Sequence, residues 1–260
     1  MKSKKIGIKS KRKTKTKISV VKQLKENMSI YWHHKLSRSW AACNFIKNMD
    51  IKCNTAPVTG RGIESYKHHL FMDQANVFKY LKTKSYLDVG CGINHLYKNA
   101  LLYKLIKKGY KAKGLDLYQF PGSNNNSKHF VSRSIKNTKL PKNSFDVITS
   151  QYFLYYWMDN ANDLLETFKE LNRILKVGGE VRIYPVYFGN FHYNNDSLLN
   201  YLSKQFDIEV LKPKFVREKV AYIYPGEDIK DLKVTDSSVP TKEAEDAKTL
   251  EASLVIFKKK

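Results

Sequence analysis

The chain has 260 residues and a formal net charge of +23, with room for one α/β domain and an extension. Its three cysteines (Cys43, Cys53, Cys91) form no C-x-x-C pair, so the sequence favours neither a disulfide framework nor a metal site. No apolar run approaches the ~20 residues of a membrane span. We therefore expect no membrane span and an intracellular, cytoplasmic protein, with a nuclear location as the alternative.

The charge is concentrated at the N-terminus. Residues 1–17 hold nine Lys or Arg and no acid, which predicts a disordered basic tail. Such a tail attracts RNA or another polyanion, with an affinity that falls as salt rises. The other interpretation is a tail that only targets or solubilises the protein.

A helical extension is predicted next, over residues 18–62. Within it Met28, Trp32, Leu36 and Trp40 are spaced four apart and share one helix face. The extension ends in a loop over residues 54–62, after which the main domain is expected to run over 63–260. A second helical stretch, Ile63 to Lys82, leads into the first strand of that domain.

The stretch from Ser85 to Leu96 reads as a strand, a tight glycine loop and a helix start. A dinucleotide-binding loop would have a third glycine where His95 stands. Instead, Asp88, Gly90 and Gly92 resemble the first motif of class I S-adenosylmethionine-dependent methyltransferases. Asn94 takes the place of that motif's last glycine, and we expect it to keep the turn because asparagine also adopts left-handed backbone conformations.

This resemblance implies several contacts. A helix before the glycine loop commonly covers the cofactor in this family, which makes Arg61, Tyr66 and His69 candidate contacts. The next strand, Lys111 to Leu117, ends in Asp116, where the ribose hydroxyls of the cofactor would lie. A carboxylate suits them because it accepts both hydroxyl protons.

The following stretch departs from the family in one respect. Residues 118–127 are too polar and broken for a good helix, and the third strand, about His129 to Ser134, is followed by no acid to receive the adenine amino group. Adenine recognition would then use the backbone, a serine or Asn137, which makes Ser134 and Ile135 the candidates.

Two further phrases resemble the family. Leu140 to Ser150 matches its turn and fourth strand, and the strand end places Ser150 and Gln151 beside the ligand crevice. The aromatic cluster that follows is expected to line the methyl-transfer pocket, with core packing as the alternative for about half of its members. This cluster comprises Tyr152, Phe153, Tyr155, Tyr156 and Trp157.

The second phrase, Glu170 to Glu180, joins a predicted helix from Asp159 to Val177 to a fifth strand from Glu180 to Tyr184. A helix over Leu198 to Gln205, a strand over Phe206 to Leu211 and an antiparallel last strand over Ser253 to Phe257 complete the domain. An insertion is expected at about residues 225–248.

The resemblance implies a Rossmann-like, doubly wound α/β fold with a mostly parallel seven-stranded sheet and an antiparallel last strand. It implies S-adenosyl-L-methionine as cofactor and methyl transfer to an unidentified acceptor, with a small molecule or protein favoured and RNA as a further option. The alternative is a nucleic-acid-binding protein whose methyltransferase fold is catalytically idle. The predicted cofactor-binding residues are Asp88, Gly90, Cys91, Gly92, Asn94, Asp116, Leu117, Ser134, Ile135, Ser150 and Gln151. No catalytic residue stands out, and the candidates are His95, Tyr152, Tyr184 and His192.

Overall fold

The computed structural model describes residues 58–117, 128–154, 161–186, 196–213, 219–223, 229–236 and 253–260. The predicted basic tail over residues 1–17 and the helical extension as far as residue 57 lie outside these ranges. So do His192, three of the cluster aromatics at 155–157, and most of the predicted insertion.

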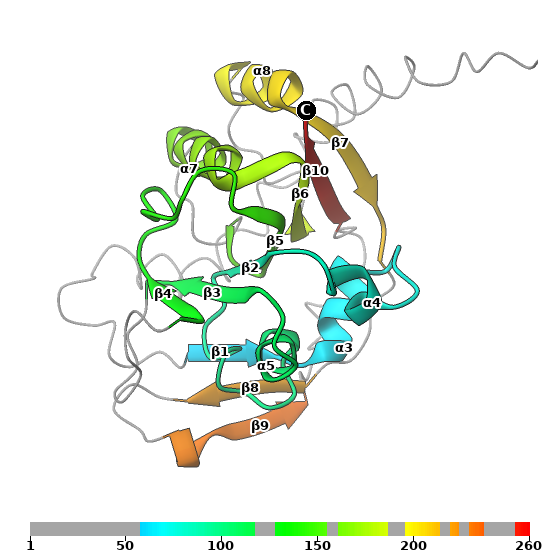
Figure 1. The fold of residues 1–260 in the computed structure, drawn as a ribbon, viewed down its shortest axis with the longest axis vertical. Coiled ribbons are helices and arrows are strands. Elements are labelled where there is room, and N and C mark those ends of the chain that lie inside the picture. The colour runs from blue at the N-terminus through cyan, green and yellow to red at the C-terminus, as the bar shows by residue number, and fades with distance from the viewer. Residues whose placement is uncertain are drawn as a thin grey trace, which may run out of the picture.

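A seven-stranded sheet forms the centre of the domain, in the order β4-β3-β2-β5-β6-β10-β7 (Figure 1). Its first five strands are parallel, and β10 lies antiparallel between β6 and β7. The predicted Rossmann-like fold with an antiparallel last strand is therefore confirmed. The strands are β4 (Phe130–Ser132), β3 (Ala112–Asp116), β2 (Tyr86–Val89), β5 (Phe145–Gln151), β6 (Leu175–Val186), β10 (Ser253–Lys259) and β7 (Phe206–Leu211).

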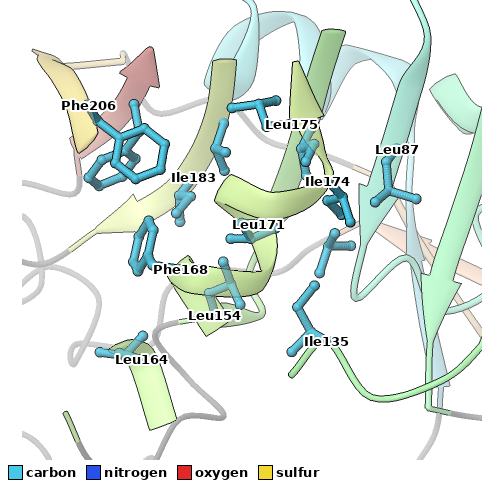
Figure 2. Packing of buried hydrophobic residues seen from close by; sticks show 14 of the residues in the cluster. Leu87, Ile135, Leu154, Leu164, Phe168, Leu171, Ile174, Leu175, Ile183 and Phe206 are labelled. Atoms are coloured by element: carbon cyan, nitrogen blue, oxygen red, sulfur yellow. The ribbon is translucent and has the colours of Figure 1, made fainter. Parts of the chain in front are cut away.

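Helices cover both faces of this sheet because its strands are apolar on both sides. Along β5, Ile148 belongs to the cluster under α7 (Ala161–Ile174) and α8 (Asp196–Gln205), whereas Val147 faces the other helices. Figure 2 shows Phe168, Leu171 and Ile174 of α7 packed toward Ile183 and Leu87. The opposite face carries α3 (Ile63–Ser65), the π-helix η3 (Tyr66–Leu70), α4 (Val77–Leu81) and α5 (Leu101–Lys107).

Three predicted helices differ from the structure. The helix predicted to end at Val177 ends at Ile174, because β6 already begins at Leu175. The stretch from Ile63 to Lys82 is broken, because the chain turns after η3 and α4 begins afresh at a cap in which Asn76 Oδ1 accepts from Lys79 N at 3.0 Å. The helix after the glycine loop begins at Leu101 rather than Leu96. The residues before it form turns, one of which is tied to a neighbouring strand by the bond from Ile93 N to Thr59 O.

A second sheet was not expected from the sequence. Three strands, β1 (Val58–Arg61), β8 (Lys219–Ile223) and β9 (Lys233–Asp236), pair in antiparallel fashion (Figure 1). The loop predicted over residues 54–62 is therefore wrong for residues 58–61, where β1 pairs along its whole length with β8. The insertion expected at about residues 225–248 contains β9 and the short 3-10 helix η5 (Ile229–Asp231).

This small sheet packs against the segment that follows the glycine loop. Ala221 and Ile223 of β8 share a buried cluster with Ile93, Tyr97 and Ala100. None of the described helices is both long and apolar enough to cross a membrane.

Candidate active site

The glycine loop lies across the carboxyl ends of β2 and β3. Gly90 and Gly92 have φ of +67° and +48°, a region that residues with a Cβ rarely adopt. Gly90 N donates to Leu115 O at 2.8 Å, and Gly92 N donates to Asp116 Oδ2 at 2.8 Å. The loop is thus held against β3 by its backbone, and the half-buried Asp116 carboxylate is fixed at the strand end.

Asp88 lies beneath the loop and is only 1% exposed. Its Oδ2 accepts from Tyr66 Oη at 2.7 Å and Asn94 Nδ2 at 3.0 Å, and its Oδ1 accepts from Thr149 Oγ1 at 3.0 Å. Burial raises the pKa of Asp88 to about 6, against the opposing effect of these three donors. The contacts show a carboxylate that ties the loop to its surroundings.

Asn94 connects three elements through its side chain. Its Oδ1 accepts from Arg61 N at 2.8 Å, while its Nδ2 donates to Tyr66 Oη at 2.6 Å as well as to Asp88. The expectation that Asn94 adopts a left-handed backbone is wrong, because its φ is not positive. The Asn94 side chain instead forms hydrogen bonds that link β1, η3 and the glycine loop.

A second polar cluster lies at the ends of β5 and β6. Gln151 Nε2 donates to Ser65 Oγ at 2.6 Å and lies 3.3 Å from His69 Nδ1. The His69 ring stacks on Tyr184, with ring centroids 4.3 Å apart. Burial lowers the pKa of His69 to about 4, so the imidazole is neutral at pH 7. In the described part of the chain, His69 Nε2 and Gln151 Oε1 are buried without a hydrogen-bond partner.

Aromatic side chains surround this cluster. Tyr152 has φ of +53°, an uncommon conformation for a bulky residue, and strained residues of this kind cluster at active sites. Its ring meets Tyr184 edge to face at 5.6 Å, and the Arg61 guanidinium lies 4.4 Å from its centroid. Phe153 covers the glycine loop so closely that a Cβ on Gly90 would lie 2.2 Å from Phe153 Cγ.

The other predicted residues take varied positions. Cys91 is buried in the loop, and burial raises the pKa of its thiol. Leu117 is 53% exposed beyond Asp116, whereas Ile135 lies in the hydrophobic core. Ser134 Oγ accepts from Lys136 N at 3.3 Å, and Ser150 is fully buried at the end of β5.

The structure brings together two of the four catalytic candidates, Tyr152 and Tyr184. His95 stacks instead on Phe130 of β4 at 4.3 Å, and burial lowers its pKa to about 4. Sequence reasoning missed Ser65 and Thr149. For Thr149 a signal was present, since it lies two residues before Gln151 and so shares its face of β5. Within the described ranges, no three His, Cys, Asp or Glu side chains gather closely enough to hold a metal ion.

Comparisons with known proteins are informative over the centre of the chain. Residues 87–183, from β2 into β6, match the family model of a methyltransferase domain. No curated protein matches the chain.

Solved structures match over a larger share of the chain at low identity. An S-adenosylmethionine-dependent methyltransferase from Archaeoglobus fulgidus is 16% identical, covering 76% of this chain and 98% of its own, with a TM-score of 0.41. Another from Mesorhizobium loti is 16% identical over 69% and 92%, with a TM-score of 0.40. The N-methyltransferase NodS from Bradyrhizobium japonicum is 13% identical over 70% and 89%, with a TM-score of 0.39.

The matched residues contain the glycine loop, Asp116 and the strand ends that position them. Over residues 87–183, the chain therefore resembles a methyltransferase domain.

Proposed function

We propose that the protein transfers the methyl group of S-adenosylmethionine to an acceptor held at the carboxyl edge of the large sheet. The observation that carries this proposal is the pairing of Asp116 with Gly92 N across the ends of β2 and β3. It fixes a carboxylate beside the backbone of Gly92, which carries no side chain, an arrangement that suits a ribose diol and an adjacent polar tail.

Five of the cofactor-binding residues proposed from the sequence then have two kinds of role. Gly92 and Asp116 offer backbone and carboxylate to the cofactor, and Gly90, which Phe153 covers, shapes the turn of the loop. Asp88 and Asn94 act beneath them, because their side chains bond to protein groups and hold the loop in place. The remaining members of the set are Cys91, Leu117, Ser134, Ile135, Ser150 and Gln151; Ile135 would contribute through the core.

The acceptor end of the site is proposed at His69, Gln151, Tyr152 and Tyr184. Gln151 Nε2 is a donor only, so its contact with His69 Nδ1 makes Nδ1 the acceptor and places the ring proton on Nε2. The cluster then offers one N–H donor and, at Gln151 Oε1, one acceptor. Such a pair holds a neutral polar group by hydrogen bonds, and the tyrosine rings flank it.

S-adenosylmethionine supplies an electrophilic methyl group when bound. The residues of this chain have then to hold the acceptor in line, and orientation alone supplies up to about 7–11 kcal/mol of barrier lowering. With its pKa near 4, His69 is a weak base. We therefore assign it to positioning through Nε2–H.

Calorimetry with the purified full chain tests the cofactor site. We expect Asp116→Ala to weaken S-adenosylmethionine binding by about 1.5–3 kcal/mol, roughly 10- to 150-fold. Asp207→Ala, on exposed β7, is the matched control and should bind normally. If the wild-type chain fails to bind the cofactor at millimolar concentration, the proposed methyl transfer is refuted and the alternative, a methyltransferase fold without catalytic activity, is favoured.

The acceptor class needs a second experiment. Methyl-labelled cofactor, full-length protein and a cell lysate are incubated together, and the label is followed into RNA, protein, lipid and small-molecule fractions. We expect His69→Ala to abolish labelling with cofactor affinity unchanged. Labelling that persists at the wild-type rate would show that His69 does not position the acceptor.

A further inference from the structure

The segment from α4 to the start of β3 is strongly basic. Residues 79–113 contain nine lysines and a single acid, and that acid is the buried Asp88. Along this stretch of the sequence the lysines therefore have no exposed acidic neighbour. They are Lys79, Lys82, Lys84, Lys98, Lys104, Lys107, Lys108, Lys111 and Lys113.

Seven of these lysines belong to elements that pack together. The Phe78 ring of α4 meets Tyr110 edge to face at 6.5 Å, and Lys108 Nζ lies 5.5 Å from the Phe78 centroid. The loop after α4 joins the same region, because Tyr86 N donates to Lys111 O at 2.8 Å. We call this region the α4–α5 basic surface; its lysines are Lys79, Lys82, Lys84, Lys104, Lys107, Lys108 and Lys111.

The lysines of this surface differ from the basic residues of α7 in their pairing. Among the described residues, none of its seven lysines forms an ion pair with a carboxylate. Helix α7 differs, since Lys169 pairs with Glu166 at 2.7 Å and Arg173 with Glu170 at 2.6 Å. If these unpaired lysines reflected only a lysine-rich composition, the basic residues of α7 would be unpaired as well. Clustered like charges repel one another and cost stability, so a polyanionic partner explains the contrast best.

The side chains between the lysines indicate which polyanion. Tyr103 and Tyr110 are half-exposed, and Lys107 Nζ lies 5.5 Å from the Tyr103 centroid. Aromatic rings among cations suit single-stranded nucleic acid, whose bases stack while its phosphates are neutralised. A lipid surface fits less well, because the exposed large apolar residues of the described chain (Met72, Leu117, Val177, Val234) all lie outside the segment from α4 to β3.

We propose that the α4–α5 basic surface binds single-stranded nucleic acid. This inference does not depend on methyl transfer. It also differs from an affinity of the N-terminal tail, because it assigns binding to folded residues. The Cβ atoms of lysines three or four positions apart on α5 are about 5–6 Å apart. This spacing allows successive lysine side chains to reach different phosphates of one nucleic-acid strand.

The test compares two triple variants of the full chain that make the same change in charge. Lys82, Lys107 and Lys111, all exposed on the surface, are changed to Glu in one variant. Lys139, Lys142 and Lys204, exposed elsewhere, are changed to Glu in the control. Binding of fluorescein-labelled oligouridine and oligothymidine of about 20 nucleotides is followed by anisotropy, at about 50 to 200 mM salt.

We expect the surface variant to lose at least about tenfold in affinity for the oligomers. Its plot of log K against log salt should also become shallower by about 2, because three phosphate contacts are lost. Equal losses in both variants would show that only net charge or the tail matters, and would overturn the proposal. Wild-type binding to phosphatidylserine vesicles but not to either oligomer would overturn it as well. Circular dichroism melting and cofactor calorimetry, expected to be unchanged, show that both variants are folded.

Discussion

Replacing Gly90 by alanine tests how closely the glycine loop is packed. At φ of +67° an alanine costs about 1–2 kcal/mol for the left-handed backbone alone. Its Cβ would also lie 2.2 Å from Phe153 Cγ, so the ring has to move. A displaced, half-buried phenylalanine loses up to about 1.5–3 kcal/mol of burial. We therefore expect Gly90→Ala to lower the free energy of unfolding by about 2–4 kcal/mol.

Urea unfolding measures this loss, and Gly109 provides the matched control. Gly109 has φ of +74°, but nothing lies within 4 Å of an added Cβ, so Gly109→Ala reports the backbone cost alone. In a double-mutant cycle, Phe153→Ala should relieve part of the cost of Gly90→Ala, because the clash disappears. The packing argument fails if Gly90→Ala costs no more than Gly109→Ala and the cycle is additive.

Three further changes test the polar network around the site. Asn94→Ala removes three side-chain hydrogen bonds, two of them to the buried Tyr66 hydroxyl and Asp88, and should cost about 2–4 kcal/mol in urea unfolding; Asn99→Ala, exposed nearby, should cost little. Arg182, which is 1% exposed, pairs with Asp73 and Glu180, each at 2.6 Å. Arg182→Met leaves both carboxylates without this cation and should lower the free energy of unfolding by about 3–5 kcal/mol; a loss under about 1 kcal/mol would contradict this. The pKa of Asp88 is raised to about 6, above its unfolded value near 4, so its contribution to stability is fully present below pH 4 and is lost as pH rises through 6. Unfolding at several pH values should show this slope in the wild type and not in Asp88→Asn; parallel curves would refute it.

The large sheet and its loop could be predicted because their signals are local or follow a topological rule. Gly90 and Gly92 follow the buried strand β2 within a few residues, and Asp116 ends β3, the next strand along the chain. Neighbouring parallel strands end at one edge of a sheet, which is why the bond from Gly92 N to Asp116 Oδ2 joins residues 24 apart.

The small sheet could not be predicted in the same way. Its pairing of Thr59 with Tyr222 and Gly60 with Ala221 joins segments far apart in the chain, and no periodicity within either segment carries that register. Gly60 itself weakens the strand signal, since glycine disfavours strands. The structure supplies its reason: a Cβ there would lie 2.8 Å from Ile93 Cγ1, so β1 approaches the segment after the glycine loop too closely for a side chain.

The presence of Asn94 in place of a glycine changes how the site works as a unit. A glycine at position 94 would form no side-chain hydrogen bonds, whereas the Asn94 amide joins the loop to Arg61 N and to Tyr66 Oη. Tyr66 and His69 lie on the same short helix η3, and the Arg61 side chain covers Tyr152. The groups proposed to hold cofactor and acceptor thus share one hydrogen-bonded support. Asn94→Ala should therefore lower cofactor affinity and methyl transfer together, whereas His69→Ala should lower transfer alone. If Asn94→Ala leaves cofactor affinity unchanged, the loop is held in place without this support.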